Sequence, residues 1–379
     1  MINLPIETRQ FSGKRLETEA EFEGLAPISQ AGLKQFSLER MLGYGVDYAD
    51  AIELRARIID GVEWKRAAIS IAEDLLALAP PTAPFPTRIS ACHRAAALLR
   101  MGQMMMLENT QERAALYARS ADLYQQASEL GLNRERVLID GPGGRLAGWL
   151  IKASIAPAVG STIVFGGIEG WAMDFDSMGD ALAARGVDAL MLDCPGQGET
   201  RFAHDHYLTA DWLADLTAVI DYLTARAPDR PIGIVGNSMG GSLAMNVAGT
   251  DKRIAACCNN GGVIKPSMGR TVGGAFFAKM VAFCGAVDED QATSIWESVT
   301  PLEASGNPGY PLLVVQGGRD ILVPTAHGQM LLDMAPTQDK RMVLFSDGDH
   351  CIYNHRSDRD NLVADWMLER LSAAPGSQS

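Results

Sequence analysis

The sequence predicts an α/β protein, in which a mostly parallel sheet of about eight strands follows an all-helical segment. Up to about residue 133, apolar residues recur at spacings of three and four and no convincing strand occurs. From residue 134 onward, short β-rich runs alternate with helical stretches. At 379 residues the chain is also longer than one ordinary domain. We therefore expect an N-terminal helical cap domain over 1–133 and an α/β domain over 134–379.

Four or five amphipathic helices are predicted in the first part, at 38–42, 49–59, 64–79, 89–107 and 111–130. A proline cluster between Pro80 and Pro86 interrupts the series, because proline donates no backbone hydrogen bond and restricts the residue before it. We expect a turn between two helices there.

The eight β-rich runs lie at 136–139, 146–152, 161–165, 187–193, 231–235, 255–259, 311–316 and 341–345. The first two are joined by a glycine-rich turn and predict an antiparallel hairpin. Most of the others alternate with helical stretches at 174–185, 209–226, 238–248, 325–334 and 359–372. That alternation is typical of a parallel sheet covered on both faces.

The segment 262–309 is long for a connection inside such a sheet. It carries large apolar side chains at helical spacing, namely Phe276, Phe277, Met280, Phe283 and Trp296. Small helices over the carboxyl edge of the sheet are expected, acting either as a lid insertion or as helices that complete the core.

Composition excludes several classes of protein. The chain is 47% hydrophobic and 21% charged, without an apolar run long enough to span a membrane. A net charge of −13 argues against nucleic acid, and the six scattered cysteines argue against both a disulfide framework and a zinc site. The first residues lack the pattern of a signal peptide, so a cytoplasmic location is expected. We expect no metal and no organic cofactor.

The most informative motif surrounds Ser238. It reads Gly236-Asn237-Ser238-Met239-Gly240, and it lies between an apolar strand and a helical stretch. This G-x-S-x-G pattern is typical of a nucleophile elbow, where small residues two before and two after the serine let strand and helix pass closely.

An acid and a base follow the serine at the ends of later strands. Asp320 lies just past the run 311–316, and His350 lies in the loop after 341–345. The order Ser, Asp, His is the order of the α/β-hydrolase fold. In that arrangement His350 takes the proton of Ser238, and Asp320 orients the imidazole and stabilises its cation. The motif, the order and the strand ends together predict an α/β-hydrolase fold and a serine hydrolase.

A loop after the strand 161–165 completes the predicted site. The oxyanion hole needs one amide from the residue after the nucleophile, which is Met239, and one from this loop. Ile168 is the preferred second donor and Gly167 the next. Glu169 is either a substrate-binding or proton-transfer group or a solvated loop acid. Trp171 either forms a wall of the substrate pocket or packs under the loop.

Other features predict little chemistry. His204-Asp205-His206 resembles a metal fragment, but no further ligand accompanies it, and a surface loop is the favoured interpretation. Cys194-Pro195-Gly196-Gln197-Gly198 lacks the lysine of a phosphate-binding loop.

With these residues in view, the chain resembles the FrsA-like branch of the α/β-hydrolases. The resemblance covers most of the chain and is weakest in the helical part, where it extends through residues 40–50. The motifs that carry it are Gly166-Gly167-Ile168-Glu169, Asp193-Cys194-Pro195-Gly196-Gln197-Gly198-Glu199, Gly236-Asn237-Ser238-Met239-Gly240-Gly241 and Asp347-Gly348-Asp349-His350-Cys351, with Asn354 shortly after.

The resemblance implies a helical N-terminal domain over the active site, a homodimer, the same triad and an acidic residue near the substrate at Glu169. Members of this branch cleave a carbon–carbon bond next to an aryl or polyketide ketone, and others are esterases. We therefore expect a small aromatic or hydrophobic substrate. Ester hydrolysis, acyl transfer or cyclisation through an acyl-serine, and a binding role without catalysis are the alternatives.

Overall fold

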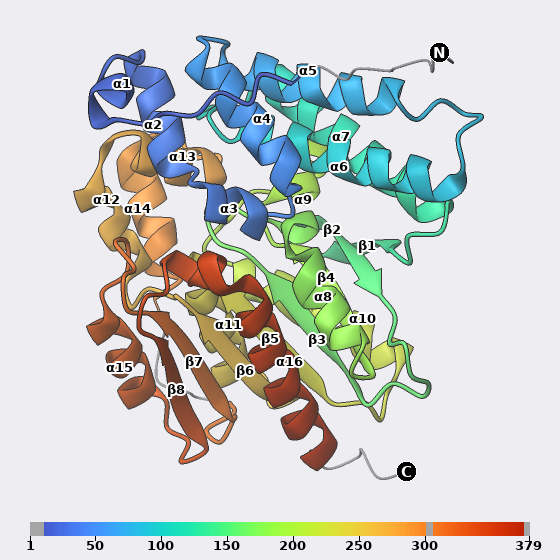
Figure 1. The fold of residues 1–379 in the computed structure, drawn as a ribbon. Coiled ribbons are helices and arrows are strands. Elements are labelled where there is room, and N and C mark those ends of the chain that lie inside the picture. Colours follow the sequence, from blue (N-terminus) through green and yellow to red (C-terminus); the bar gives the residue numbers. More distant parts are fainter. Residues whose placement is uncertain (1–10, 301–305, 375–379) are drawn as a thin grey trace, which may run out of the picture.

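The protein is described here from a computed structural model, which covers residues 11–300 and 306–374. Its centre is one eight-stranded sheet in the order β1-β2-β4-β3-β5-β6-β7-β8 (Figure 1). Strand β2 pairs antiparallel with both β1 and β4, and all other neighbours are parallel. The strands are β1 (Glu135–Gly141), β2 (Gly144–Ile151), β3 (Gly160–Phe165), β4 (Val187–Asp193), β5 (Ile232–Asn237), β6 (Ile254–Asn260), β7 (Leu312–Gly317) and β8 (Lys340–Phe345).

Helices cover both faces of the sheet, as the alternating pattern predicts. On one face, α8 (Asp176–Ala183) and α16 (Arg356–Ala373) share a core with alternate side chains of the strands. On the other face, α10 (Trp212–Arg226), α11 (Met239–Thr250) and α15 (Thr325–Met334) bury the intervening side chains. Because every second residue of a strand points to the same face, the strands β2 to β8 contribute to both cores, while β1 contributes only to the second.

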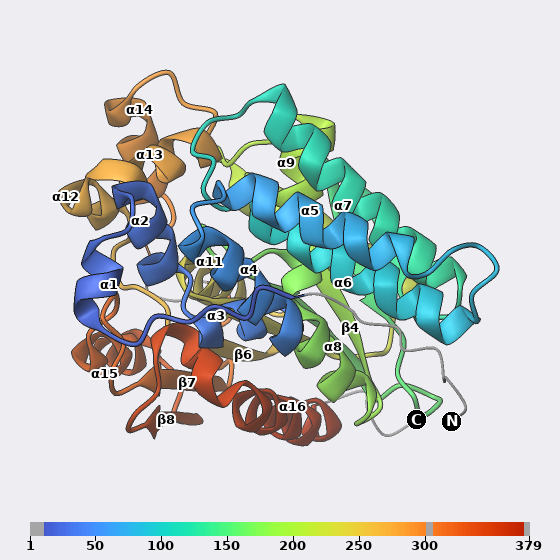
Figure 2. The ribbon, with the colours of Figure 1, turned by 45° about the horizontal axis from the view of Figure 1, so that its top comes forward.

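The N-terminal helices lie over the edge of the sheet where the parallel strands end (Figures 1 and 2). They are α1 (Glu19–Glu23), α2 (Pro27–Gln35), α3 (Leu38–Gly43), α4 (Tyr48–Ile59), α5 (Trp64–Ala77), α6 (Phe85–Gln103) and α7 (Gln111–Glu129). Helices α5, α6 and α7 pack side by side, while α3 contacts the segment after β8. No helix in the described ranges combines the length and apolar character that crossing a membrane requires.

The structure differs from the sequence prediction at several short helices. Helices α1, α2 and α9 (Gly198–His204) were not predicted, because each is too short or too polar to show a clear apolar period. Helix α6 begins at Phe85, four residues before the predicted start. Pro86 lies in its first turn, where a missing backbone N–H costs nothing, so the end of the proline cluster starts a helix.

The segment after β6 folds into η2 (Pro266–Met268), α12 (Gly269–Val272), α13 (Gly274–Phe283) and α14 (Glu289–Glu297). Phe277, Met280, Phe283 and Trp296 join the core on the side of α10 and α11. Figure 2 shows α12 and α13 next to α1 and α2, so the two coverings of the sheet edge meet.

A buried ion pair fixes the helical part to the sheet. Arg100 of α6 donates from Nε to Asp174 Oδ1 at 2.7 Å, and the two side chains are 2% and 1% exposed. Asp174 lies in η1 (Ala172–Phe175), directly after the loop that follows β3, and also accepts the amide of Trp171 at 2.9 Å. The pair therefore joins α6 to the end of that loop.

Removing one member of this pair is expected to destabilise the protein strongly. Arg100→Met leaves a buried carboxylate without its cation, and we expect the free energy of unfolding to fall by about 3–5 kcal/mol. Arg119→Met removes the same side chain from the exposed pair with Glu73, and about 1 kcal/mol or less is expected there. Urea unfolding followed by circular dichroism measures both, and equal losses would contradict the structural role of Arg100.

Candidate active site

Ser238 lies at a strained turn between β5 and α11. Its backbone has φ 56° and ψ −129°, in a region that residues with a side chain rarely adopt. Two glycines permit this turn: a Cβ on Gly236 would overlap the carbonyl of Gly240, and a Cβ on Gly240 would overlap the carbonyl of Gly166. The strand, the helix and the loop after β3 therefore meet with no room for side chains at these positions.

The three residues predicted from chain order lie together. His350 Nε2 is 2.8 Å from Ser238 Oγ, and His350 Nδ1 is 2.8 Å from Asp320 Oδ2. Asp320 also accepts the amides of Leu322 and Val323 at 2.8 and 2.9 Å, which fixes its carboxylate at the end of β7. This is the geometry that lets an imidazole remove the hydroxyl proton while a carboxylate orients the ring.

A buried polar network holds the histidine segment against the elbow. His350 begins η3 (His350–His355), in which Cys351 has a left-handed backbone with φ 58°. The carbonyl of Cys351 accepts from Arg359 at 2.9 Å and from Asn260 at 3.2 Å. Asn260 also donates to the side chain of Asn237 at 2.8 Å. The network thus connects the residue before Ser238 with the residue after His350.

The surroundings of His350 favour its protonated form. Burial alone lowers the pKa of an imidazole, but the neighbouring Cys351 and Asp320 outweigh burial and raise the pKa of His350 above its usual value. Only the neutral imidazole can take the serine proton, so the deprotonated form of His350 is the one that can act as a base.

The predicted oxyanion loop passes directly over the elbow. A Cβ on Gly167 would lie 2.9 Å from both Met239 N and Ser238 Cβ. Gln197 donates to the carbonyls of Gly166 and Gly167 at 2.8 and 3.0 Å. Since N–H and C=O of a trans peptide point in opposite directions, the amides of Gly167 and Ile168 point away from Gln197. Within the described chain, neither amide donates to another backbone carbonyl.

Glu169 is neither exposed nor isolated, because it lies in a cluster of donors. Its side chain is 7% exposed and accepts from Gln35 at 3.1 and 3.2 Å and from Arg40 at 3.0 Å. Lys279 of α13 forms a second, short ion pair with it and also donates to the carbonyl of Met104 at 2.9 Å. Burial, with repulsion from nearby arginines, lowers the pKa of Lys279 to about 7, and the adjacent carboxylate acts in the opposite direction.

The sequence analysis did not identify Gln35, Arg40 or Lys279 as site residues. They lie 134, 129 and 110 positions from Glu169. The only sequence signal was the resemblance around residue 40, which marks the region and not the role of its arginine.

A cavity of about 390 Å³ opens beside Ser238 and His350. Glu169, Gln35, Arg40 and Lys279 lie at its wall, and most of the remaining surface is apolar, from Val263, Pro266, Met268, Val272, Phe276, Leu322 and Val323. An enclosed apolar space with few polar groups is typical of a site for a small hydrophobic molecule.

Two residues, Trp171 and His206, do not lie where one interpretation of the sequence placed them. Trp171 is fully buried under the loop, 5.6 Å from the ring of Tyr117, and is not among the residues that line the cavity. His206 is not in a surface loop: it is 3% exposed, and its Nε2 lies 3.0 Å from Asp215. In the described residues, no group of three His, Cys, Asp or Glu side chains could hold a metal ion.

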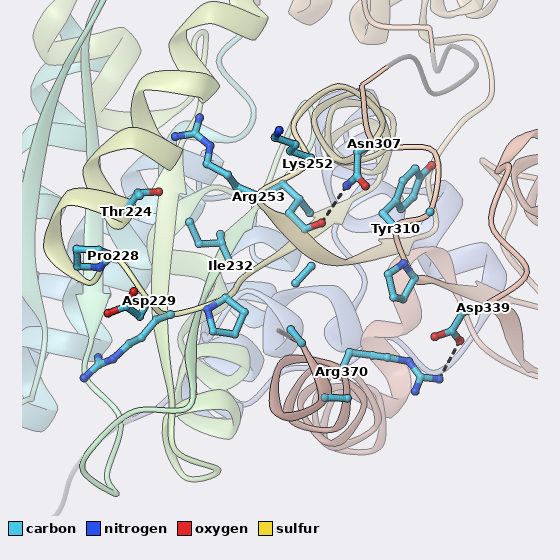
Figure 3. A pocket seen from close by; sticks show the side chains of 18 residues that line it. Thr224, Pro228, Asp229, Ile232, Lys252, Arg253, Asn307, Tyr310, Asp339 and Arg370 are labelled. Carbon is cyan, nitrogen blue, oxygen red and sulfur yellow. Dashed lines mark hydrogen bonds and ion pairs between the residues drawn. The ribbon is translucent and has the colours of Figure 1, made fainter. Parts of the chain in front are cut away.

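A larger hollow of about 710 Å³ lies at the opposite edge of the sheet, where β5 to β8 begin (Figure 3). Asn307 donates there to the carbonyl of Ile254 at 3.0 Å, and Arg370 pairs with Asp339 at 2.9 Å. None of Ser238, Asp320 and His350 lines it. Size alone therefore does not identify the reactive site, because ligands of open α/β sheets bind at the carboxyl ends of the strands.

Comparison with known proteins agrees with the fold. The model of the alpha/beta hydrolase family matches residues 160–366, more than half of the chain. The protein therefore belongs to the alpha/beta hydrolase family, and the fold and enzyme class expected from the sequence are confirmed.

Among individual proteins, the chain is similar to 2,6-dihydropseudooxynicotine hydrolase of Paenarthrobacter nicotinovorans. The two are 24% identical over 347 residues, which cover 88% of this chain and 91% of that protein. A crystal structure of the 2,6-dihydroxy-pseudo-oxynicotine hydrolase superposes with a TM-score of 0.76 at 24% identity, covering 89% of this chain and 97% of the other. The sequence motifs predicted a likeness to this hydrolase, and both comparisons confirm it.

Two further solved structures share the fold. Wild-type AbyA5 matches at a TM-score of 0.69 and 18% identity, over 89% of this chain and 98% of its own. Est1E from Butyrivibrio proteoclasticus matches at 0.51 and 22% identity, over 62% of this chain and 99% of its own.

The contact between elbow and loop gives a direct test of the oxyanion assignment. Gly240→Ala adds a Cβ that displaces the Gly166 carbonyl, so we expect kcat on p-nitrophenyl butyrate to fall by about 10²–10³-fold, as when an oxyanion donor is lost. Gly309→Ala is the control, since no described atom lies within 4 Å of an added Cβ there. Wild-type kcat in Gly240→Ala would contradict the assignment.

Proposed function

We propose that the protein is a serine hydrolase in which Ser238, His350 and Asp320 form the catalytic triad. The observation that carries this proposal is the hydrogen-bonded chain from Asp320 through His350 to Ser238, which opens into the apolar cavity. The proposed substrate is a small aromatic or polyketide-like molecule. No cofactor takes part in the proposed reaction.

In the proposed reaction, His350 removes the proton of Ser238 while Oγ attacks a carbonyl carbon. The developing oxyanion accepts hydrogen bonds from the amides of Met239 and of Ile168 or Gly167. Collapse breaks the bond to the leaving group, which takes the proton from His350. Water then attacks the acyl-Ser238, with His350 again as base, and releases an acid.

We favour a carbon–carbon bond next to a ketone as the bond that is broken. The resemblance to the FrsA-like branch supports this choice, and so does a charged cluster beside the nucleophile, because a departing carbanion needs stabilisation that an alkoxide needs less. A carboxylic ester is the alternative bond, and the fold shared with Est1E favours it. Acyl transfer or cyclisation by the same acyl-serine is a further alternative, and product analysis with an added alcohol or amine distinguishes it.

The triad is tested at its nucleophile. Ser238→Ala is expected to lower kcat on ketone and ester substrates by about a millionfold, because the residues of a triad act as a unit. Labelling by a fluorophosphonate probe should disappear in the same variant and remain in Ser298→Ala, whose hydroxyl bonds a carbonyl away from the cavity. Substantial turnover by Ser238→Ala would overturn the mechanism.

The bond type is tested with Glu169→Gln. We expect kcat/KM for an aryl 1,3-diketone to fall by at least about tenfold and that for p-nitrophenyl butyrate to change by less than about threefold, because an ester has a leaving group that needs no anion stabilisation at this wall. Equal losses, or a loss on the ester alone, would contradict carbon–carbon cleavage.

The homodimer implied by the resemblance stays a prediction, which sedimentation of the purified protein measures.

A further inference from the structure

One end of the cavity is cationic. Arg40 and Lys279 both line it, and within the described residues Glu169 is the one carboxylate among the lining side chains. The side chains of Arg40, Lys279 and Glu169 are 17%, 5% and 7% exposed, so water screens them little. Two buried cations share one anion.

Each cation carries one hydrogen more than it has acceptors among the described residues. Of the three ammonium hydrogens of Lys279, two are used by Glu169 and by a backbone carbonyl at the end of α6. Of the five guanidinium hydrogens of Arg40, two point to Tyr44, one to Glu169 and one to the carbonyl of Gln35. Among the described residues, one hydrogen on each cation thus has no protein acceptor.

The excess of positive charge at this wall is electrostatically unfavourable, and a bound anion would compensate it. A buried charge without a partner is unfavourable. Burial lowers the pKa of Lys279 to about 7, and the nearby positive charges of Arg113 and Arg40 act in the same direction. A negatively charged oxygen placed here would favour the protonated lysine and compensate the excess charge.

We propose that Lys279 and Arg40 form a subsite for a substrate oxygen that becomes negatively charged during the reaction. This oxygen is the second carbonyl oxygen of a 1,3-dicarbonyl compound. This inference rests on the proposed function, because it names the substrate class of the same cavity. The first carbonyl would lie at Ser238 and the second, one carbon away, would face the cationic wall, while the apolar side chains of the cavity hold the rest of the carbon skeleton.

The subsite has a defined role in carbon–carbon cleavage. Oγ of Ser238 forms a bond to the first carbonyl carbon, and its proton passes to His350. When the tetrahedral intermediate collapses, the bond to the central carbon breaks and its electron pair moves onto the second carbonyl, which becomes an enolate oxygen. Lys279 and Arg40 stabilise that oxygen, and the central carbon takes the proton from His350. Water then releases the acyl group as a carboxylic acid.

In this arrangement Glu169 is a positioning residue. Its contacts with Gln35, Arg40 and Lys279 are all with donors, so its oxygens act as acceptors, as those of an ionised carboxylate do. It holds both cations in place against their mutual repulsion. Charge that stabilises an anion mainly in the transition state raises kcat more than it lowers KM.

Binding of a simple anion tests the subsite without turnover. Calorimetry with Ser238→Ala should show that benzoate binds at least about tenfold more tightly than benzamide. Adding Lys279→Met should weaken benzoate binding by about 10- to 100-fold, the usual value of a charged hydrogen bond, and leave benzamide unchanged. Lys34→Met is the matched control, since this exposed lysine of α2 does not line the cavity.

Turnover gives the second readout. Lys279→Met should lower kcat on 1-phenyl-1,3-butanedione by about 10- to 100-fold and change kcat on p-nitrophenyl butyrate by less than about threefold. If this variant does not fold, as judged by circular dichroism, Lys279→Gln keeps a donor without the charge and should show the same selectivity.

Equal losses on both substrates, or benzoate binding that does not exceed benzamide binding, would overturn the subsite. Turnover that survives Ser238→Ala would instead overturn the proposed function. The comparison of benzoate with benzamide decides the subsite in either case.

Discussion

The ion pairs and hydrogen bonds of the Glu169 carboxylate join three separate parts of the chain into one site. Gln35 and Arg40 come from α2 and α3, Glu169 from the loop after β3, and Lys279 from α13. Each cation needs a buried partner, and the same carboxylate serves both. The helical cover, the sheet and the helices after β6 therefore meet at one point on the cavity wall.

The position of this cluster matters because of what lies next to it in the sequence. Glu169 follows the two glycines whose backbone passes over Ser238, so one short loop carries both the amides proposed for the oxyanion hole and the carboxylate of the cluster. Asp174 anchors the end of the same loop through Arg100. Gln197 holds the carbonyls of Gly166 and Gly167, so the position of the proposed oxyanion amides does not depend on the ion pairs of Glu169.

The fold and the three residues of the proposed triad could be predicted because their signals are local. All eight strands were placed within a few residues, since alternation and glycine turns are short-range patterns. Ser238, Asp320 and His350 each stand at a recognisable strand end, and a parallel sheet brings those ends to one edge. Short helices such as α2 and α9 were not predicted, because packing against the rest of the protein stabilises them more than their own sequence does.

The sequence by itself determined the class of fold, the order of serine, acid and base, and the glycines that the elbow requires, since backbone geometry and periodicity are properties of neighbouring residues. Only the tertiary structure decided that Glu169 is an acceptor for two cations, that Lys279 and Arg40 line the cavity, and that Trp171 packs beneath the loop. These facts depend on contacts between residues more than a hundred positions apart or on which side of a loop faces a cavity. No local pattern specifies such contacts, because they form only when the helical cover packs on the sheet.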